Sequence, residues 1–450
     1  MPFCCLRALP YQPAPTLYFE RIRRAPGAVL LDSCHSGAQR GRFDLLSAWP
    51  LASLQPQPGE PGLGFLARAR EALAGLGQAQ LPEGCELPFA GGLIGYLAYD
   101  FGRHLEPSPA PNLDDLHLPA ATLGLYAWAL VIDHHARTST LVLHPALPAG
   151  EGERLATLFQ APAAARLPGR FHLTEPLTSD IDAAHYSQAF DRVKAYIAAG
   201  DCYQVNLTRR FSGRCQGDPW VAYQHLRHVC PVPFSGYLQL EGGITLLSHS
   251  PERFIAVHDG QVETRPIKGT RPRGRTPRED RDNAAQLLAS PKDRAENLMI
   301  VDLLRNDLGR ACRIGSVRVP ELFALESYPN VHHLVSCIRG DLATGKDVMD
   351  LLAGSFPGGS ITGAPKIRAM QIIDEVEPTQ RGIYCGSLLY VDVRGEMDSS
   401  IAIRTVLVKG DRIHCWGGGA VVADSNCQAE FEESHYKVQV LLQALADLPA

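Results

Sequence analysis

A proline-, alanine- and glycine-rich segment from His144 to Gly169 divides this 450-residue chain into two regions of different pattern. Before it, short apolar runs bounded by turn residues, such as Ala28 to Asp32, predict buried strands and few long helices. After it, apolar residues at helical spacing begin behind Asp182 and end at Gly200, which predicts an amphipathic helix. We therefore expect an N-terminal region over residues 1–168 and a second region over residues 180–448.

The second region combines long helices with many strand candidates. A helix is predicted to begin after Ser290, because Pro291 suits its first position and Asp293 follows three residues after the cap. A further helix is predicted from about Gln428 to Leu445. The strand candidates are Ile244 to Ser248, Gln261 to Ile267, Ser387 to Asp392, Ile401 to Lys409 and Arg412 to Trp416. This mixture predicts a large α/β or α+β fold with helices packed over extensive sheet.

Composition excludes several classes of protein. Hydrophobic residues make up 45% of the chain and charged residues 20%, which is typical of a packed globular protein. The net charge of −5 gives no reason to expect nucleic acid as a partner. The 12 cysteines show no metal-ligand spacing, and no apolar run is long enough for a signal peptide or a membrane span. We expect a cytoplasmic protein with reduced thiols and no membrane contact.

Arg404 lies in a run, Ile401 to Val408, whose apolar residues would occupy both faces of a strand. A guanidinium in such a strand needs an anion. Two interpretations stay open: a structural ion pair, and a clamp on the carboxylate of a ligand.

Carboxylates also align with apolar stripes on two helices. Glu430, Glu433 and Lys437 share one face of the last helix, and Glu296 aligns with apolar residues of the helix that follows Ser290. A salt bridge on a helix surface is the simpler interpretation. The alternative is a magnesium site, since this ion takes one or two protein carboxylates and keeps several waters.

Two glycine-rich segments, Gly417 to Gly419 and Phe356 to Lys366, are predicted to be turns that expose backbone N–H groups. They could bind an anion or could be turns for steric reasons alone, and neither has the spacing of a nucleotide-binding motif. Lys268 ends a strand before an arginine-rich stretch, where a solvated lysine is the usual interpretation.

These segments together resemble the chorismate-utilising enzymes, and the match runs in order through the second half of the chain. It rests on Gly200-Asp-Cys-Tyr-Gln-Val-Asn206, Ser250-Pro-Glu-Arg-Phe254, Pro266-Ile-Lys-Gly-Thr270, the run from Asp293 to Asp307, Thr362-Gly-Ala-Pro-Lys366, Ile403-Arg-Thr405 and Gly417-Gly-Gly419. Within the family the sequence is most similar to component I of the aminodeoxychorismate synthases, also through Leu30 to Ser33 and Gly91 to Tyr96.

The resemblance implies a chorismate-utilising fold, magnesium as cofactor and a set of site residues. Glu296 and Glu433 resemble the magnesium ligands. Binding of the dicarboxylate chorismate is implied for His333, Thr362, Tyr390, Arg404, Gly417, Gly418, Gly419 and Lys437. Because His332 is adjacent to His333, the sequence leaves the choice between these two open.

The implied reaction replaces the C4 hydroxyl of chorismate by an amino group, toward p-aminobenzoate and folate. Glu252 resembles the general acid that protonates the departing hydroxyl. Lys268 resembles the family's covalent nucleophile, at a position where anthranilate synthases and isochorismate-forming relatives carry alanine. A free lysine is neutral in only about one molecule in 2,500 at pH 7, so the site must favour the neutral amine.

Two further ligands are implied. Ammonia should come from a separate glutamine amidotransferase subunit, because this chain shows no Gly-x-Cys-x-Gly nucleophile motif. A tryptophan pocket is implied by Ser33, Arg40, Gly41, Arg42, Phe43, Pro233, Phe234 and Ser235. The alternatives are an anthranilate synthase component I, which Lys268 disfavours, and a non-catalytic regulator that binds chorismate or tryptophan.

Overall fold

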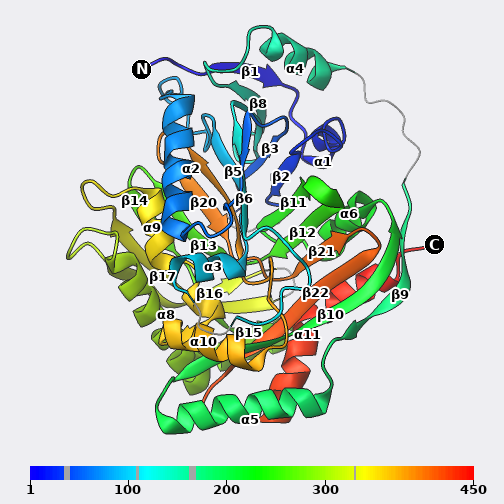
Figure 1. Ribbon diagram of the computed structural model, residues 1–450, viewed down its shortest axis with the longest axis vertical. Coiled ribbons are helices and arrows are strands. Elements are labelled where there is room, and N and C mark those ends of the chain that lie inside the picture. The colour runs from blue at the N-terminus through cyan, green and yellow to red at the C-terminus, as the bar shows by residue number, and fades with distance from the viewer. Residues whose placement is uncertain (35–40, 108–110, 162–168, 329–330, 450) are drawn as a thin grey trace.

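The computed structural model describes residues 1–34, 41–107, 111–161, 169–328 and 331–449, and Arg40 of the predicted tryptophan pocket lies outside them. Two antiparallel sheets dominate the described part of the chain (Figure 1). In spatial order, the larger sheet contains β1 (Cys5–Leu9), β8 (Thr138–Leu143), β7 (Trp128–Asp133), β3 (Phe43–Ser47), β2 (Val29–Asp32), β11 (Phe234–Leu240), β12 (Ile244–Ser250), β21 (Thr405–Lys409), β22 (Arg412–Val421), β10 (Gln204–Gly217) and β18 (Gly363–Ala364), with β9 (Phe171–Ser179) paired to β10.

The second sheet carries the other described strands. In spatial order it contains β15 (Ile267–Pro272), β17 (Val331–Asp341), β14 (Gln261–Thr264), β13 (Arg253–His258), β20 (Met397–Ser400), β19 (Ser387–Asp392), β5 (Gly92–Leu97), β6 (Ala121–Tyr126) and β4 (Ala52–Leu54), with β16 (Arg318–Ser327) paired to β17. The mixed fold with extensive sheet is thus as the sequence predicts.

Helices cover the sheets and lie at their ends. They are α1 (Thr16–Phe19), α2 (Gly62–Leu76), α3 (Gly102–Leu105), α4 (Glu151–Gln160), α5 (Ala183–Ala199), α6 (Pro219–Val229), α7 (Pro277–Ala289), α8 (Pro291–Gly309), α9 (Val348–Ser355), α10 (Lys366–Val376) and α11 (Cys427–Ala446). In Figure 1, α11 runs beside β22 and α8 lies beside β15, while α10 packs against β10 and β18.

Burial on both faces explains why the central strands of the larger sheet carry apolar residues on each face. On β12, Leu246 belongs to the core that the two sheets share, whereas Leu247 belongs to a second core formed with α4, α6 and α11. Alternate residues of a strand point to opposite faces, so neighbouring leucines serve different cores. Each face therefore supplies apolar side chains to a core.

The caps of α5 and α8 lie where the sequence predicts them, whereas the cap of α11 was not predicted. Ser290 caps α8 by accepting a hydrogen bond from the N–H of Asp293, with Pro291 at the first helical position. Asp182 caps α5 in the same way, and Gly200 ends it with a φ of 82°, a conformation that glycine adopts without a steric penalty. Asn426 caps α11.

The segment from His144 to Gly169 departs from its interpretation as a linker, because α4 forms within it. Leu155, Ala156 and Phe159 recur at helical spacing and are buried. The low complexity of the surrounding residues hid this short pattern. Both sheets also contain strands from residues 1–168 and from residues 180–448, so the division of the sequence does not separate the sheets. As a domain boundary it stays a prediction.

None of the helices in the described ranges has the length and apolar character that crossing a membrane requires.

Acid is expected to destabilise the protein through His249. This β12 side chain is fully buried, and burial lowers its pKa to about 3. The unfolded chain therefore binds a proton near pH 6.5 that the folded chain excludes, so stability present above pH 6.5 is lost as pH falls toward about 3, by on the order of 1 kcal/mol per pH unit. Urea unfolding at pH 7, 6 and 5 should show this loss, and His249→Leu should reduce it. The exposed His228→Leu serves as control. If the free energy of unfolding changed equally with pH in the wild type and in His249→Leu, the assignment of this acid sensitivity to His249 would be contradicted.

Candidate active site

Glu252 and Lys268 come together where two strand connections meet. Glu252 is buried between β12 and β13, and Lys268 is the second residue of β15. Nζ of Lys268 donates a hydrogen bond to the carbonyl of Ser360 at 3.2 Å. The Ser360 side chain also lies close enough to the Glu252 carboxylate to act on its pKa. Ser360 thus links the two side chains, a contact that the sequence did not single out.

The pKa shifts of these two residues follow from burial. Burial raises the pKa of Glu252, while Lys268 and the hydrogen bonds from Ser360 and the Ile267 backbone act against this rise. Burial also lowers the pKa of Lys268, and the nearby Lys437 lowers it further. A carboxyl that keeps its proton to higher pH thus lies beside an amine that loses its proton more readily. This pairing suits general acid and nucleophilic chemistry.

Carboxylates on two helices complete the cluster. Lys268 lies within electrostatic range of Glu296 on α8 and of Glu433 on α11. Burial raises the pKa of Glu296, although Lys268 and Lys292 oppose the rise. For Glu433, burial acts to raise the pKa, but Lys437, Lys292 and Lys268 together lower it. The two helices therefore direct carboxylates toward the same lysine.

Lys437 forms the salt bridge on the helix surface that was the simpler interpretation of its helix face. Its Nζ lies 2.7 Å from Oε1 of Glu433, an i, i+4 salt bridge on α11, and donates to the carbonyl of Gly418 at 2.9 Å. Since both partners of this salt bridge are about half exposed, it contributes little to stability. Its effect is to hold a cation beside Lys268.

Glu296 and Glu433 fit a magnesium ion by their chemistry. Both supply hard oxygen ligands, and within the described ranges neither forms an ion pair with an arginine that would compete for the metal. The cation nearest to Glu296 is Lys292, at 3.9 Å. Within those ranges no cluster of three or more His, Cys, Asp or Glu side chains could hold a metal ion. Magnesium does not need one, because waters and an anionic substrate complete its shell.

Gly417 to Gly419 lie inside β22, so the prediction of a turn there is wrong. They pair with Arg209 to Leu207 of β10, whereas the pairing of β22 with β21 ends at Cys415. A Cβ on Gly417 would lie 1.9 Å from the carbonyl of Ser434, and one on Gly419 would lie 2.7 Å from Oε2 of Glu430. The glycines therefore allow α11 to approach the strand closely, which brings Glu433 to the site. Tertiary packing requires them.

Arg404 also differs from its prediction, because it lies just before β21 and not within the strand. Its φ is 49°, and its Nη1 lies 3.9 Å from Sγ of Cys230. It forms no ion pair with a carboxylate in the described part of the chain. The predicted structural ion pair is therefore not found there.

His333, rather than His332, faces Arg404. Nδ1 of His333 is 2.8 Å from the Thr270 hydroxyl, and burial together with Arg404 lowers the pKa of His333 to about 4. His332 points to the other face of β17 and contacts Ser327 and Asp280. The alternation of the strand thus separates two histidines that the sequence could not distinguish.

The segment from Phe356 to Lys366 forms the wall beside Lys268. Thr362 is buried, and its hydroxyl donates to the carbonyl of Gly358 at 3.0 Å, so it stabilises this segment from within. Lys366 pairs with Asp307 of α8 at 2.7 Å and also donates to the carbonyl of Ser355 at 2.6 Å. This buried pair joins the motif that ends at Asp307 to the motif that ends at Lys366, so both motifs help to anchor the wall.

Tyr390 is placed elsewhere, in a separate cavity of about 1,120 Å³. This cavity is lined by the remaining described residues of the predicted tryptophan pocket, namely Ser33, Gly41, Arg42, Phe43, Pro233, Phe234 and Ser235. Arg42 is held by Asp133 and Glu86, both at 2.8 Å. The structure therefore brings the predicted pocket together and adds Tyr390 to it, away from Lys268.

Comparisons with known proteins agree with this arrangement. The chain is 44% identical to the aminodeoxychorismate synthase component 1 of Salmonella typhimurium over 97% of each chain, and 42% identical to that of Escherichia coli over 96% of each. It is 37% identical to the anthranilate synthase component 1 of Mycolicibacterium smegmatis, over 95% of this chain and 87% of that one.

Solved structures share the fold. The anthranilate synthase component I of Streptococcus pneumoniae superposes with a TM-score of 0.78 at 29% identity, covering 89% of this chain and 92% of that one. The menaquinone-specific isochorismate synthase of Escherichia coli gives a TM-score of 0.75 at 19% identity, covering 99% and 95%, which shows the fold alone. Residues 38–443 match the sequence pattern of chorismate binding enzymes. The chain therefore belongs to the chorismate binding enzyme family.

Proposed function

We propose that this chain is the chorismate-aminating subunit of an aminodeoxychorismate synthase, which replaces the C4 hydroxyl of chorismate by an amino group. The observation that carries this proposal is Lys268, a partly buried amine with a lowered pKa beside the buried carboxyl of Glu252. Relatives named aminodeoxychorismate synthase component 1 match nearly the whole chain. The product would be a precursor of p-aminobenzoate and folate.

The reaction uses the two side chains in sequence. The neutral amine of Lys268 adds to C2 of chorismate, the ring double bond shifts, and the C4 hydroxyl leaves as water with the proton of Glu252. Ammonia then adds to C4, the double bond shifts back, and the C2–N bond to Lys268 breaks. The ammonium group formed at C4 returns one proton to Glu252. The balance is chorismate and ammonia in, aminodeoxychorismate and water out.

Cationic and backbone groups would bind the dicarboxylate substrate. Arg404 has a guanidinium without a carboxylate partner among the described residues, and its fork suits a substrate carboxylate. Lys437 and the backbone of Gly417 to Gly419 lie beside Glu433. His333 is neutral at pH 7 and can accept or donate a hydrogen bond there.

Glu296 and Glu433 would hold magnesium. Bound there, the ion would neutralise charge on the ring carboxylate of the substrate. Lys268 and Lys292 favour the charged forms of both carboxylates, although burial still raises the pKa of Glu296.

Replacing Glu433 by glutamine should weaken magnesium binding by about 10-fold or more, because one of two anionic ligands is lost. Calorimetric titration of the chain with magnesium, with a chorismate-bound sample in parallel, measures the effect. The matched control is Glu432→Gln, which removes the neighbouring exposed carboxylate of the same helix. Equal affinities for the two variants would contradict the assignment of Glu433.

A glutamine amidotransferase subunit would supply the ammonia. The matching relatives are named component 1, which indicates a second component. The cavity with Ser33, Phe234 and Tyr390 would hold tryptophan, since its lining combines apolar and aromatic side chains with polar ones.

Anthranilate synthase is the second candidate, favoured by relatives of 37% identity. A coupled assay separates the two: the chain is supplied with chorismate, magnesium and ammonium, and an aminodeoxychorismate lyase is added. Formation of p-aminobenzoate only when the lyase is present supports the proposal. Anthranilate formed without the lyase would favour the second candidate.

A further inference from the structure

The two reacting side chains lie at irregular points of the second sheet. Glu252 immediately precedes β13, whose pairing with β20 shifts register between Arg253 and Ala256. Lys268 lies in β15, whose pairing with β17 shifts register between Ile267 and Thr270. A register shift interrupts the ladder of backbone hydrogen bonds. Backbone hydrogen bonds remain here, such as the one that Ile401 donates to the carbonyl of Glu252 at 3.0 Å, but the ladder is interrupted beside each catalytic side chain.

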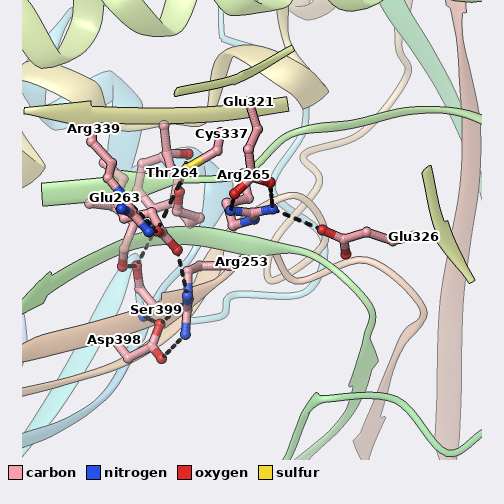
Figure 2. Close-up of polar contacts among 12 residues, drawn as sticks. Arg253, Glu263, Thr264, Arg265, Glu321, Glu326, Cys337, Arg339, Asp398 and Ser399 are labelled. Atoms are coloured by element: carbon pink, nitrogen blue, oxygen red, sulfur yellow. Dashed lines mark hydrogen bonds and ion pairs between the residues drawn. The ribbon is translucent and has the colours of Figure 1, made fainter. Parts of the chain in front are cut away.

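An ion pair joins the segments that carry them. Nη1 of Arg253 donates to Oε1 of Glu263 at 3.1 Å, and Figure 2 shows the two side chains pointing toward each other. Arg253 follows Glu252 directly, while Glu263 is the third of the four residues of β14, the strand that leads toward Lys268. The β13–β14 ladder pairs Ala256 to His258 with Glu263 to Gln261, so this ion pair joins Arg253, which lies before the ladder, to the last paired residue of β14.

Both partners are held by further charges. Arg253 binds Asp398 through two hydrogen bonds of 3.0 and 2.9 Å, and the other oxygen of Glu263 accepts from Arg339 at 2.9 Å (Figure 2). The Arg253 and Glu263 side chains are 19% and 18% exposed, so water screens their interaction less than at an open surface. The bidentate contacts between the guanidinium and its carboxylates leave the Arg253 and Glu263 side chains little freedom to rotate.

The peptide before Lys268 is also anchored on both sides. The hydroxyl of Thr264 donates to the carbonyl of Phe254 at 2.5 Å, which links it to the Glu252 segment. Arg265 donates to Glu321 at 2.6 Å and to Glu326 at 3.0 Å, which links it to β16 (Figure 2). Side chains thus add anchors to the peptide that leads to Lys268.

We propose that the Arg253–Glu263 ion pair is a positioning device that sets Glu252 and Lys268 at the spacing the reaction needs. Both residues line the cavity assigned to tryptophan, and neither is assigned contact with chorismate. The inference rests on the proposed function, because there Glu252 acts at C4 while Lys268 acts at C2 of the same ring. Misplacement by about 1 Å can cost a factor of about 100 in rate.

Three variants test this inference, namely Arg253→Met, Glu263→Gln and the double variant Arg253→Met/Glu263→Met. Each is expected to lower kcat for amination by about 10- to 100-fold with KM for chorismate changed by less than about 3-fold. The double variant should lose no more than the worse single variant, because the two residues act as a unit. The alkaline limb of the pH–kcat profile, assigned to Glu252, should move in all three. Arg253→Lys should recover only part of the rate, since it keeps the charge but not the fork.

Arg23→Met is the matched control. It removes an ion pair with Asp218 at 2.9 Å, whose side chains are 9% and 22% exposed, from the second core near α1 and α6. It should lower thermal stability without moving kcat or its pH profile. If the variants of the Arg253–Glu263 pair behave like Arg23→Met while the wild type aminates chorismate, the inference is wrong and the proposed function stands. A wild type that is folded and does not aminate chorismate overturns both.

Discussion

Replacing Lys268 by alanine is expected to lower the rate of chorismate amination by at least about 100-fold, the lower end of what a positioned reacting group contributes. The variant loses the amine that adds to C2, while Glu252, Glu296 and Glu433 remain. Lys268→Arg should fail more completely, because the guanidinium is larger, stays protonated and fills the space next to Ser360. Steady-state amination with ammonium measures both variants.

The covalent role has its own readout. With chorismate but no ammonium, the wild type should form an adduct of chorismate minus water on the peptide that contains Lys268, detectable by mass spectrometry. Lys346→Ala, at an exposed lysine paired with Asp350, is the control and should keep both rate and adduct. Full activity of Lys268→Ala and Lys268→Arg would show that the covalent role is wrong.

Glu252→Gln is expected to lower kcat by about 10² to 10⁴, the range for loss of a general acid. The glutamine keeps the shape of the side chain but cannot give a proton to the leaving hydroxyl. Because burial raises the pKa of Glu252, the wild type should keep the acid form to higher pH than an ordinary glutamate. The rate should then fall on the alkaline side as Glu252 ionises, and on the acid side as Lys268 is protonated.

Profiles of kcat against pH test this assignment. The alkaline limb should disappear in Glu252→Gln and persist in the control Glu241→Gln, which changes an exposed carboxylate beside β12. A Glu252→Gln variant that keeps both the rate and the alkaline limb would exclude Glu252 as the acid.

Local signals in the sequence predicted the helices around the site well. Ser290 with Pro291, Asp182 with Gly200, and the apolar spacing of the last helix act within a few residues, and the structure places these helices accordingly. The short helix α4 was missed because its apolar spacing lies in a segment dominated by proline, alanine and glycine.

Features set by tertiary packing were harder to predict. Gly417 to Gly419 are glycines because α11 approaches β22, not because the chain turns there. Arg404 precedes its strand in a left-handed conformation, which a run of apolar neighbours does not reveal. Tyr390 points to the cavity rather than to Lys268, and only the register of β19 decides this.

The convergence of Glu252, Lys268, Glu296 and Glu433 could be expected only from resemblance to a family. These residues are up to 181 positions apart in the chain, and no local pattern brings two helices and two strand ends together. The Ser360 bridge and the Arg253–Glu263 pair were missed for the same reason: each depends on contacts across the fold.

The central claim is that this chain places nitrogen on C4 of chorismate. The most direct measurement supplies the chain with chorismate, magnesium and ¹⁵N-ammonium at alkaline pH and locates the label in the product by NMR and mass spectrometry. The account predicts a product that keeps the enolpyruvyl group and carries ¹⁵N at C4. Labelled anthranilate, or chorismate recovered unchanged from a folded chain that binds it, would contradict the account.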